Sequence, residues 1–276
     1  MPNIGGRLYQ VTAKLDRAKK HLFDLKIIHE EFVNSHPIEI QQAGGTFYVK
    51  SIKEPGAIFA ATIGDIIQNL VSALDHLAYQ LVCMGKNSEG PFNYVYFPFS
   101  ENEEKYQKRK LQKLKGAKQN VLDLMDKVKP YKGGNNILWR LHELNNIDKH
   151  RLLITVGGAY NTINLGTMME NMIGRLRQSL VLSRETGRMT LDCSGPIEER
   201  FKQDKIDYPM KVKDRQFPLR IGAELSSGIE CRPEDFTFYV AFGEPGFDDG
   251  NPMLEILGQM AEQVESIVLE FKPIFE

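Results

Sequence analysis

Apolar residues recur at helical spacing along three long stretches of the chain. Between about residues 7 and 34 they alternate by three and four, with lysines and acids filling the opposite face. The same pattern returns over 57–84 and 253–271, and shorter helices are predicted over 120–129 and 135–151. Because residues three and four apart share one helix face, each long stretch predicts a helix that packs through an apolar side.

Other segments alternate apolar and polar residues and predict strands. Residues 38–40 and 46–52 flank Ala43-Gly44-Gly45, which is typical of a β-hairpin. After residue 151 the pattern changes, and five short segments predict further strands: 152–156, 162–165, 176–182, 217–225 and 236–242. Gly157-Gly158 is interpreted as the turn between the first two of them. Residues 198–213 show no clear period and are interpreted as a loop.

These elements predict an α+β fold in a single domain. A helical bundle is expected from residues 4–36, 57–151 and 251–273, and β elements from 38–52 and 152–245. The antiparallel sheet would thus be inserted before the last helix of the bundle.

Polar residues gather on two of the predicted helices. On the first, Asp65, Asn69, Ser72, His76 and Tyr79 share one face beside an apolar stripe, and the second extends over 140–151. Polar groups on helices that face a core need partners, and such places often form functional sites.

One interpretation is acid–base chemistry on a phosphodiester. Glu143 and His150 share a face of the second helix, and His142 and Lys149 share another. If the helices meet through His76 and His150, two imidazoles and a carboxylate converge, and Arg140, Lys149 or Arg151 can stabilise negative charge. The alternative is a structural network in which Asp148 and Glu143 pair with arginines. The candidate catalytic residues are His76, His150, Glu143, Arg140, Arg151 and Asp75.

A metal-dependent hydrolase is a second interpretation. Glu143 is followed three residues later by Asn146, so the Glu-x-x-His pattern of di-iron bundles is absent. A mononuclear metal site is kept as an alternative interpretation, and its candidate ligands are His76, His142, His150 and Asp148. Nucleotide-binding glycine motifs and the hydrolase Gly-x-Ser-x-Gly motif are absent, and we expect no cofactor.

The formal charge of −1 gives no overall attraction to nucleic acid, but one segment is strongly basic. Residues 105–118 hold seven Lys or Arg among fourteen residues, which indicates either a solvated helix face or an RNA-contacting patch. The candidate RNA contacts are Lys108, Arg109, Lys110 and Lys113.

The sequence also indicates in which cellular compartment the protein is expected. The cysteines, Cys83, Cys193 and Cys231, show no zinc or disulfide spacing. The N-terminus lacks a signal-peptide pattern, and no uninterrupted apolar run approaches the roughly 20 residues that span a bilayer. We therefore expect a cytoplasmic protein with no membrane partner.

The two polar stretches resemble a motif of uncharacterised bacterial proteins. In them Asn-Leu-Arg-Ser-Ala-Leu-Asp-His is preceded by Gly-Asp and followed by His-Glu-Leu-Asn-Asn-x-Asp-Lys-His-Arg. Here Gly64-Asp65, 69–76 and 142–151 carry the pattern, with Val71 in place of arginine, and the resemblance covers most of 57–155.

That Arg-x4-His pattern is in turn similar to HEPN domains. These are helical bundles, many of them dimeric, metal-independent ribonucleases of toxin–antitoxin and phage-defence systems, with a composite site at the dimer interface. The resemblance implies a homodimer with His76 in the histidine role. Since valine cannot contact a phosphate, either Arg140 or Arg151 substitutes, or the chain is an inactive relative that binds RNA or a protein partner.

Overall fold

The structure is a computed structural model. It describes residues 4–43, 46–151, 153, 155–161, 220, 224–225, 236–244, 247 and 251–276. The chain forms two compact units. The first comprises Met1–Pro37, Lys53–Gly157 and Val240–Glu276, and the second comprises Ile38–Ile52 and Gly158–Tyr239.

The first unit is helical. Its helices confirm the predicted ones: α1 (Ile4–Asn34), α2 (Ala57–Lys86), α4 (Gln119–Val128), α5 (Asn136–Asp148) and α8 (Met253–Phe271). The basic stretch contributes α3 (Glu103–Lys113), and a short 3-10 turn, η2 (Lys272–Ile274), follows α8.

Side-chain caps fix where two of the shorter helices begin. The Asn102 side chain accepts a 2.9 Å hydrogen bond from the Lys105 N–H at the start of α3. Asn135 does the same for Leu138 at the start of α5, at 3.1 Å. Each cap satisfies an N–H that the first helical turn would otherwise leave unpaired.

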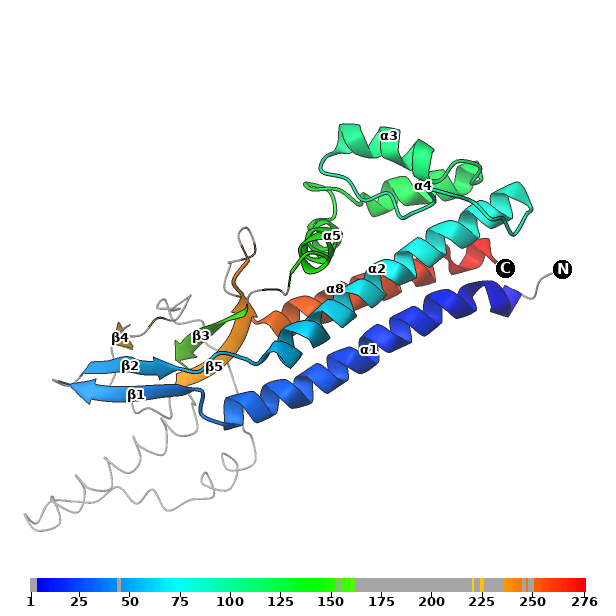
Figure 1. Ribbon diagram of the computed structural model, residues 1–276. Coiled ribbons are helices and arrows are strands. Elements are labelled where there is room, and N and C mark those ends of the chain that lie inside the picture. Colours follow the sequence, from blue (N-terminus) through cyan, green and yellow to red (C-terminus); the bar gives the residue numbers. More distant parts are fainter. Residues whose placement is uncertain are drawn as a thin grey trace, which may run out of the picture. The chain divides into compact units, whose positions relative to one another are not determined.

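Helices α2 and α8 form the middle of the bundle. Helix α1 packs against both of them, and α5 packs against both from the side opposite α1 (Figure 1). Eleven apolar α2 side chains are fully buried and give this helix its apolar faces, among them Ile63, Leu70, Leu74, Leu77 and Leu81. Helix α2 is therefore enclosed on two sides, and its residues meet different neighbours according to their direction.

The strands are short. β1 (Ile38–Ala43) and β2 (Thr46–Ile52) form the predicted antiparallel hairpin, and β4 (Glu224–Leu225) pairs antiparallel with β2. β3 (Thr155–Asn161) and β5 (Phe236–Phe242) form a second sheet of two strands. β5 matches its predicted range, whereas β3 runs through Gly157-Gly158, where a turn was expected. The segments 162–165, 176–182 and 198–213 lie outside the described residues.

By length and composition, α2 could also cross a membrane. It is the one helix with this property in the described part of the chain, and 61% of its most apolar window is buried inside the protein. The central helix of a bundle needs the same apolar character.

Candidate functional site

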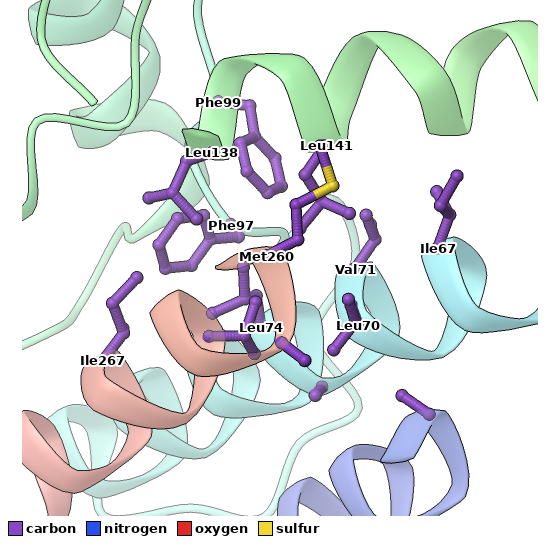
Figure 2. Packing of buried hydrophobic residues seen from close by; sticks show 14 of the residues in the cluster. Ile67, Leu70, Val71, Leu74, Phe97, Phe99, Leu138, Leu141, Met260 and Ile267 are labelled. Carbon is purple, nitrogen blue, oxygen red and sulfur yellow. The ribbon is translucent and has the colours of Figure 1, made fainter. Parts of the chain in front are cut away.

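Val71 occupies the position at which the HEPN pattern has arginine. Its side chain is 6% exposed and belongs to the main apolar cluster. Figure 2 shows it pointing from α2 towards Leu141 of α5 and Met260 of α8. This position therefore contributes to the core between three helices, and not to a polar site.

Asp75, one helical turn after Val71, meets the loop that follows α2. Its Oδ1 accepts a 2.9 Å hydrogen bond from the Phe97 N–H. Burial raises the pKa of the carboxyl to about 6, against the opposing effects of the Phe97 hydrogen bond and of the charges of Lys149 and Lys113. The carboxyl of Asp75 therefore titrates near neutrality beside two cations.

His142 of α5 lies against the same loop. Its ring stacks on Phe99, with centroids 4.8 Å apart and planes 11° from parallel. Its Nε2 lies 3.3 Å from the side-chain amide nitrogen of Asn146. Burial, assisted by the charges of Arg109 and Lys149, lowers the pKa of His142 to about 4, so the imidazole is neutral at pH 7.

Three cations surround these two groups. The Arg109 guanidinium donates a 2.7 Å hydrogen bond to the Phe99 carbonyl. The Lys113 ammonium lies 4.8 Å from the centroid of the Tyr96 ring, which is 50% exposed. The charge of Lys149, an exposed residue, acts on both Asp75 and His142. We call these residues the cationic cluster: Arg109, Lys113 and Lys149, with Asp75, His142 and Tyr96.

The charges of the cluster do not cancel. Three cations stand against one carboxylate, whose own pKa is about 6, and the histidine carries no charge at pH 7. Among its own six residues the cluster has a positive excess of about two charges, although the whole chain is nearly neutral. Outside these six, the Glu101 carboxylate also interacts with Arg109. Such a site attracts anions.

The expected meeting of His76 with His150 is not what the structure shows. His76 is half-buried, and burial and the charge of Lys14, on α1, both lower its pKa. His76 therefore lies towards α1, whereas α5 packs on the other side of α2 (Figure 1). His150 is exposed just after the end of α5.

The other predicted catalytic residues are spread along α5 and beyond it. The Cζ of Arg140 lies 5.2 Å from the centroid of the Phe247 ring. Arg151 donates two hydrogen bonds, of 2.9 and 2.7 Å, to the fully buried Glu244 carboxylate. Glu143 is half-buried on α5. The Arg151 interaction differs from both predicted roles, because its carboxylate partner comes from a distant part of the sequence.

Asp148 connects the two motif stretches. Its carboxylate lies so close to Gly64 that a Cβ at Gly64 would overlap with it. Burial, and then the charge of Asp65, raises the pKa of Asp148. Gly64 of the first stretch thus leaves room for Asp148 of the second, which gives Gly64 and Asp148 a packing role.

The predicted RNA contacts separate into two kinds. Lys110 is 6% exposed, and its ammonium contacts both carboxylate oxygens of Asp126, at 2.6 and 2.7 Å. The Lys110 ammonium therefore already has a counter-ion and little exposure, which disfavours the predicted contact with RNA. Lys108 is exposed and paired with Glu104 one turn earlier. Arg109 and Lys113 belong to the cationic cluster.

The alternative metal ligands do not come together. Among the residues that the structure describes, no three His, Cys, Asp or Glu side chains form a group that could hold a metal ion. His76, His142, His150 and Asp148 accordingly form no common site.

One residue of the cluster, Tyr96, was not proposed as a site residue from the sequence, and Lys149 was proposed only as one of three cations that could stabilise negative charge. Lys149 shares a helix face with His142, seven residues earlier, and this face, not that of His150, contributes to the cluster. Tyr96 belongs to the loop that follows α2, in which Phe97 and Phe99 are buried in the apolar cluster, whereas Tyr94 and Tyr96 are exposed.

Comparison of the chain with protein-family models, with curated proteins and with solved structures found no significant match.

Proposed function

We propose that this chain is a HEPN-like protein that binds single-stranded RNA through the cationic cluster and has lost the catalytic arginine of that class. The observation that carries the proposal is the position of Lys113 over the half-exposed ring of Tyr96, next to two further cations. The loss of catalysis is supported by Val71, whose place in the core leaves no route for a charged side chain to a substrate.

A cation beside an exposed aromatic ring suits a flexible single strand. Lysine and arginine neutralise phosphates, and the release of counterions drives binding. An exposed ring offers a stacking surface to an unpaired base, which contributes about 1–3 kcal/mol by alanine substitution. A duplex hides its bases, so Tyr96 contributes nothing to its recognition.

The test is the binding of labelled single-stranded RNA, followed by fluorescence anisotropy over a range of salt concentrations. Replacing both Lys113 and Lys149 with Gln should weaken binding and reduce the salt slope by about 1.4, since each neutralised phosphate contributes roughly 0.7 for a single strand. Tyr96→Ala should weaken binding about tenfold or more, and Tyr96→Phe should preserve it.

The matched control removes the same charge elsewhere on α3. Lys105 and Lys108 are exposed and paired with Glu101 and Glu104. The double variant Lys105→Gln, Lys108→Gln changes the net charge equally and should leave the salt slope nearly unchanged. If both double variants weaken binding alike, attraction is diffuse and the cluster is not the site.

A second candidate function is RNA cleavage with Asp75 as the base. It is favoured by one observation: the pKa of this carboxyl, beside two lysines, is about 6, close to the pH at which a general base works. Asp75→Asn distinguishes the two functions. If the cluster only binds, removing the carboxylate should strengthen RNA binding, because it removes a negative charge. If Asp75 is the base, cleavage of RNA by the wild-type chain should disappear in this variant.

A further inference from the structure

The outer face of α1 carries apolar side chains where the sequence predicted lysines and acids. Tyr9 is 69% exposed, Phe23 63% and Ile27 44%. These residues lie on the side away from Val11, Leu15, Ala18 and Leu25, through which α1 packs into the bundle. Helix α1 thus has a second, unpartnered seam in addition to its buried one.

The seam is a regular helical stripe. Its exposed members step by four, three, four, three and four residues, which keeps them in line along one face. We call it the outer stripe: Tyr9, Ala13, Asp16, Lys20, Phe23 and Ile27. It has one acid and one base at its centre and apolar or aromatic residues towards both ends.

The outer stripe is complementary to itself when it is reversed. Its positions are symmetric about residue 18, so that two antiparallel copies bring Tyr9 opposite Ile27, Ala13 opposite Phe23, and Asp16 opposite Lys20. The large Phe23 thus meets the small Ala13, and both central pairs have opposite charges. A parallel arrangement instead places Asp16 against Asp16 and Lys20 against Lys20.

We propose that the outer stripe is the interface for a second copy of this chain, packed antiparallel about a two-fold axis near residue 18. A two-fold interface uses the same patch on both subunits and must be complementary to itself. Alternation of three and four residues is also the spacing with which two helices interlock. This interface differs from the composite site of HEPN nucleases, because it involves neither Val71 nor His76.

One cation that flanks the stripe is already paired within its own subunit. Lys19, next to the centre, already pairs with Glu265 of α8 at 2.6 Å, which draws its charge towards its own subunit. Helix α1 makes its contacts within the bundle with α2 and α8, so the proposed interface uses none of the side chains that hold α1 in place.

Charge reversal at the centre tests both the interface and its direction. The molar mass of the full chain is measured by light scattering and sedimentation over the micromolar range, and the wild type should be a dimer. Asp16→Lys leaves two lysines facing two lysines, and Lys20→Asp leaves acids facing acids, so each variant should be at least tenfold weaker in dimerisation. Mixed together, the two variants should form a heterodimer, since every central pair is then opposite in charge.

The double variant Asp16→Lys, Lys20→Asp separates the two directions of packing. In the antiparallel arrangement it restores both opposite-charge pairs, and the dimer should return. In a parallel arrangement it leaves like charges together, and the dimer should stay weak. Glu31→Lys is the matched control, because residue 31 lies opposite the uncharged residue 5. It should leave the mass unchanged.

Cross-linking fixes the register. Ala13→Cys and Phe23→Cys variants, mixed and oxidised, should form a disulfide between subunits. Ala13→Cys alone should not, because its two copies would stand about 15 Å apart along the axis at 1.5 Å per residue. The wild type reports any link through native cysteines.

A monomeric wild type, or charge-reversed variants that dimerise as well as the wild type, would overturn the proposal. RNA binding plays no part in these measurements, so their failure leaves the cationic cluster untouched. The proposal is supported if the wild type is a dimer, each single charge reversal weakens it, and both the mixture of the two variants and the double variant restore it. A second copy is then the occupant of the stripe.

Discussion

The pair formed by Lys110 and Asp126 should respond unequally to the loss of its two members. Lys110 is 6% exposed and its ammonium lies between both carboxylate oxygens of Asp126, whose side chain is 41% exposed. Asp126 also accepts a 2.9 Å hydrogen bond from the Tyr106 hydroxyl. Removing the lysine leaves an acid that water can reach, whereas removing the acid leaves a buried cation with no counter-charge.

The expected costs follow from that asymmetry. Asp126→Asn should lower the free energy of unfolding by about 3 kcal/mol, the lower end for a buried charge that loses its partner. Lys110→Met retains most of the buried apolar stem and should cost about 1 kcal/mol or less. In the double variant the buried ammonium of Lys110 is absent, so the loss of stability should be close to that of Lys110→Met alone. The double-mutant cycle should therefore be strongly non-additive.

The assay is urea denaturation followed by far-UV circular dichroism, which reports the helices. Equal costs for the two single variants, or additive costs in the double variant, would contradict the placement of Lys110 inside the protein. The RNA measurement supplies a second readout. Lys110→Met should bind RNA as the wild type does, because the lysine already has a counter-ion and is not accessible to a phosphate.

The remaining predictions concern glycines, titration and the arginine position. Gly258→Ala should stabilise the fold by roughly 0.5–1 kcal/mol, because a Cβ there meets nothing within 4 Å, whereas Gly85→Ala should destabilise it by about 1–3 kcal/mol, because its Cβ would overlap a backbone carbonyl; chemical denaturation checks both. The pKa of Asp75 is raised from 3.8 to about 6, so the folded state binds its proton more tightly and stability falls as pH rises through this window. Asp75→Asn should therefore stabilise the protein by about 1–3 kcal/mol at pH 7 and by little near pH 4, and equal gains at both would refute it. The pKa of His142 is lowered from 6.5 to about 4, so its contribution to stability is lost as pH falls through that window, and His142→Phe, which keeps the stacked ring, should reduce the loss seen in acid melting curves. Val71→Arg should cost about 3–5 kcal/mol by burying an unpaired guanidinium, and a stable variant that cleaves RNA would refute the core assignment.

The helices could be predicted from the sequence because their apolar spacing is the physical cause of their packing. Helix α8 has its predicted range, and α1 lies within a few residues of it. β3 differed because Gly157-Gly158 was interpreted as a turn, although glycine also fits an extended strand. Local sequence patterns do not predict which distant residues pair in the fold. The ion pair between Arg151 and Glu244 is an example.

The site was harder to predict than the fold, since charge says little about direction. Lys110 looks like its neighbours in a basic run, yet it shares one face of α3 with the buried Tyr106, four residues earlier, and with the buried Leu114, four residues later. That spacing was the available signal. The outer face of α1 carried the same kind of signal, because helical spacing places Phe23 and Ile27 on the side away from Val11, Leu15 and Leu25.

The geometry of α2 explains why its polar motif does not form one site. Successive residues on a helix point about 100° apart, so Asp75 and His76 cannot both face α5 when the helix is enclosed by α1 on one side and α5 on the other. Asp75 takes the side of Lys149 and Phe97, and His76 takes the side of Lys14. Val71 is one turn from Asp75 and so shares its side, where the core excludes a charge. An arginine at that position and a histidine five residues later would likewise face different neighbours within one subunit. The residues able to act together are therefore those around Asp75, and the RNA-binding and cleavage experiments are directed at them.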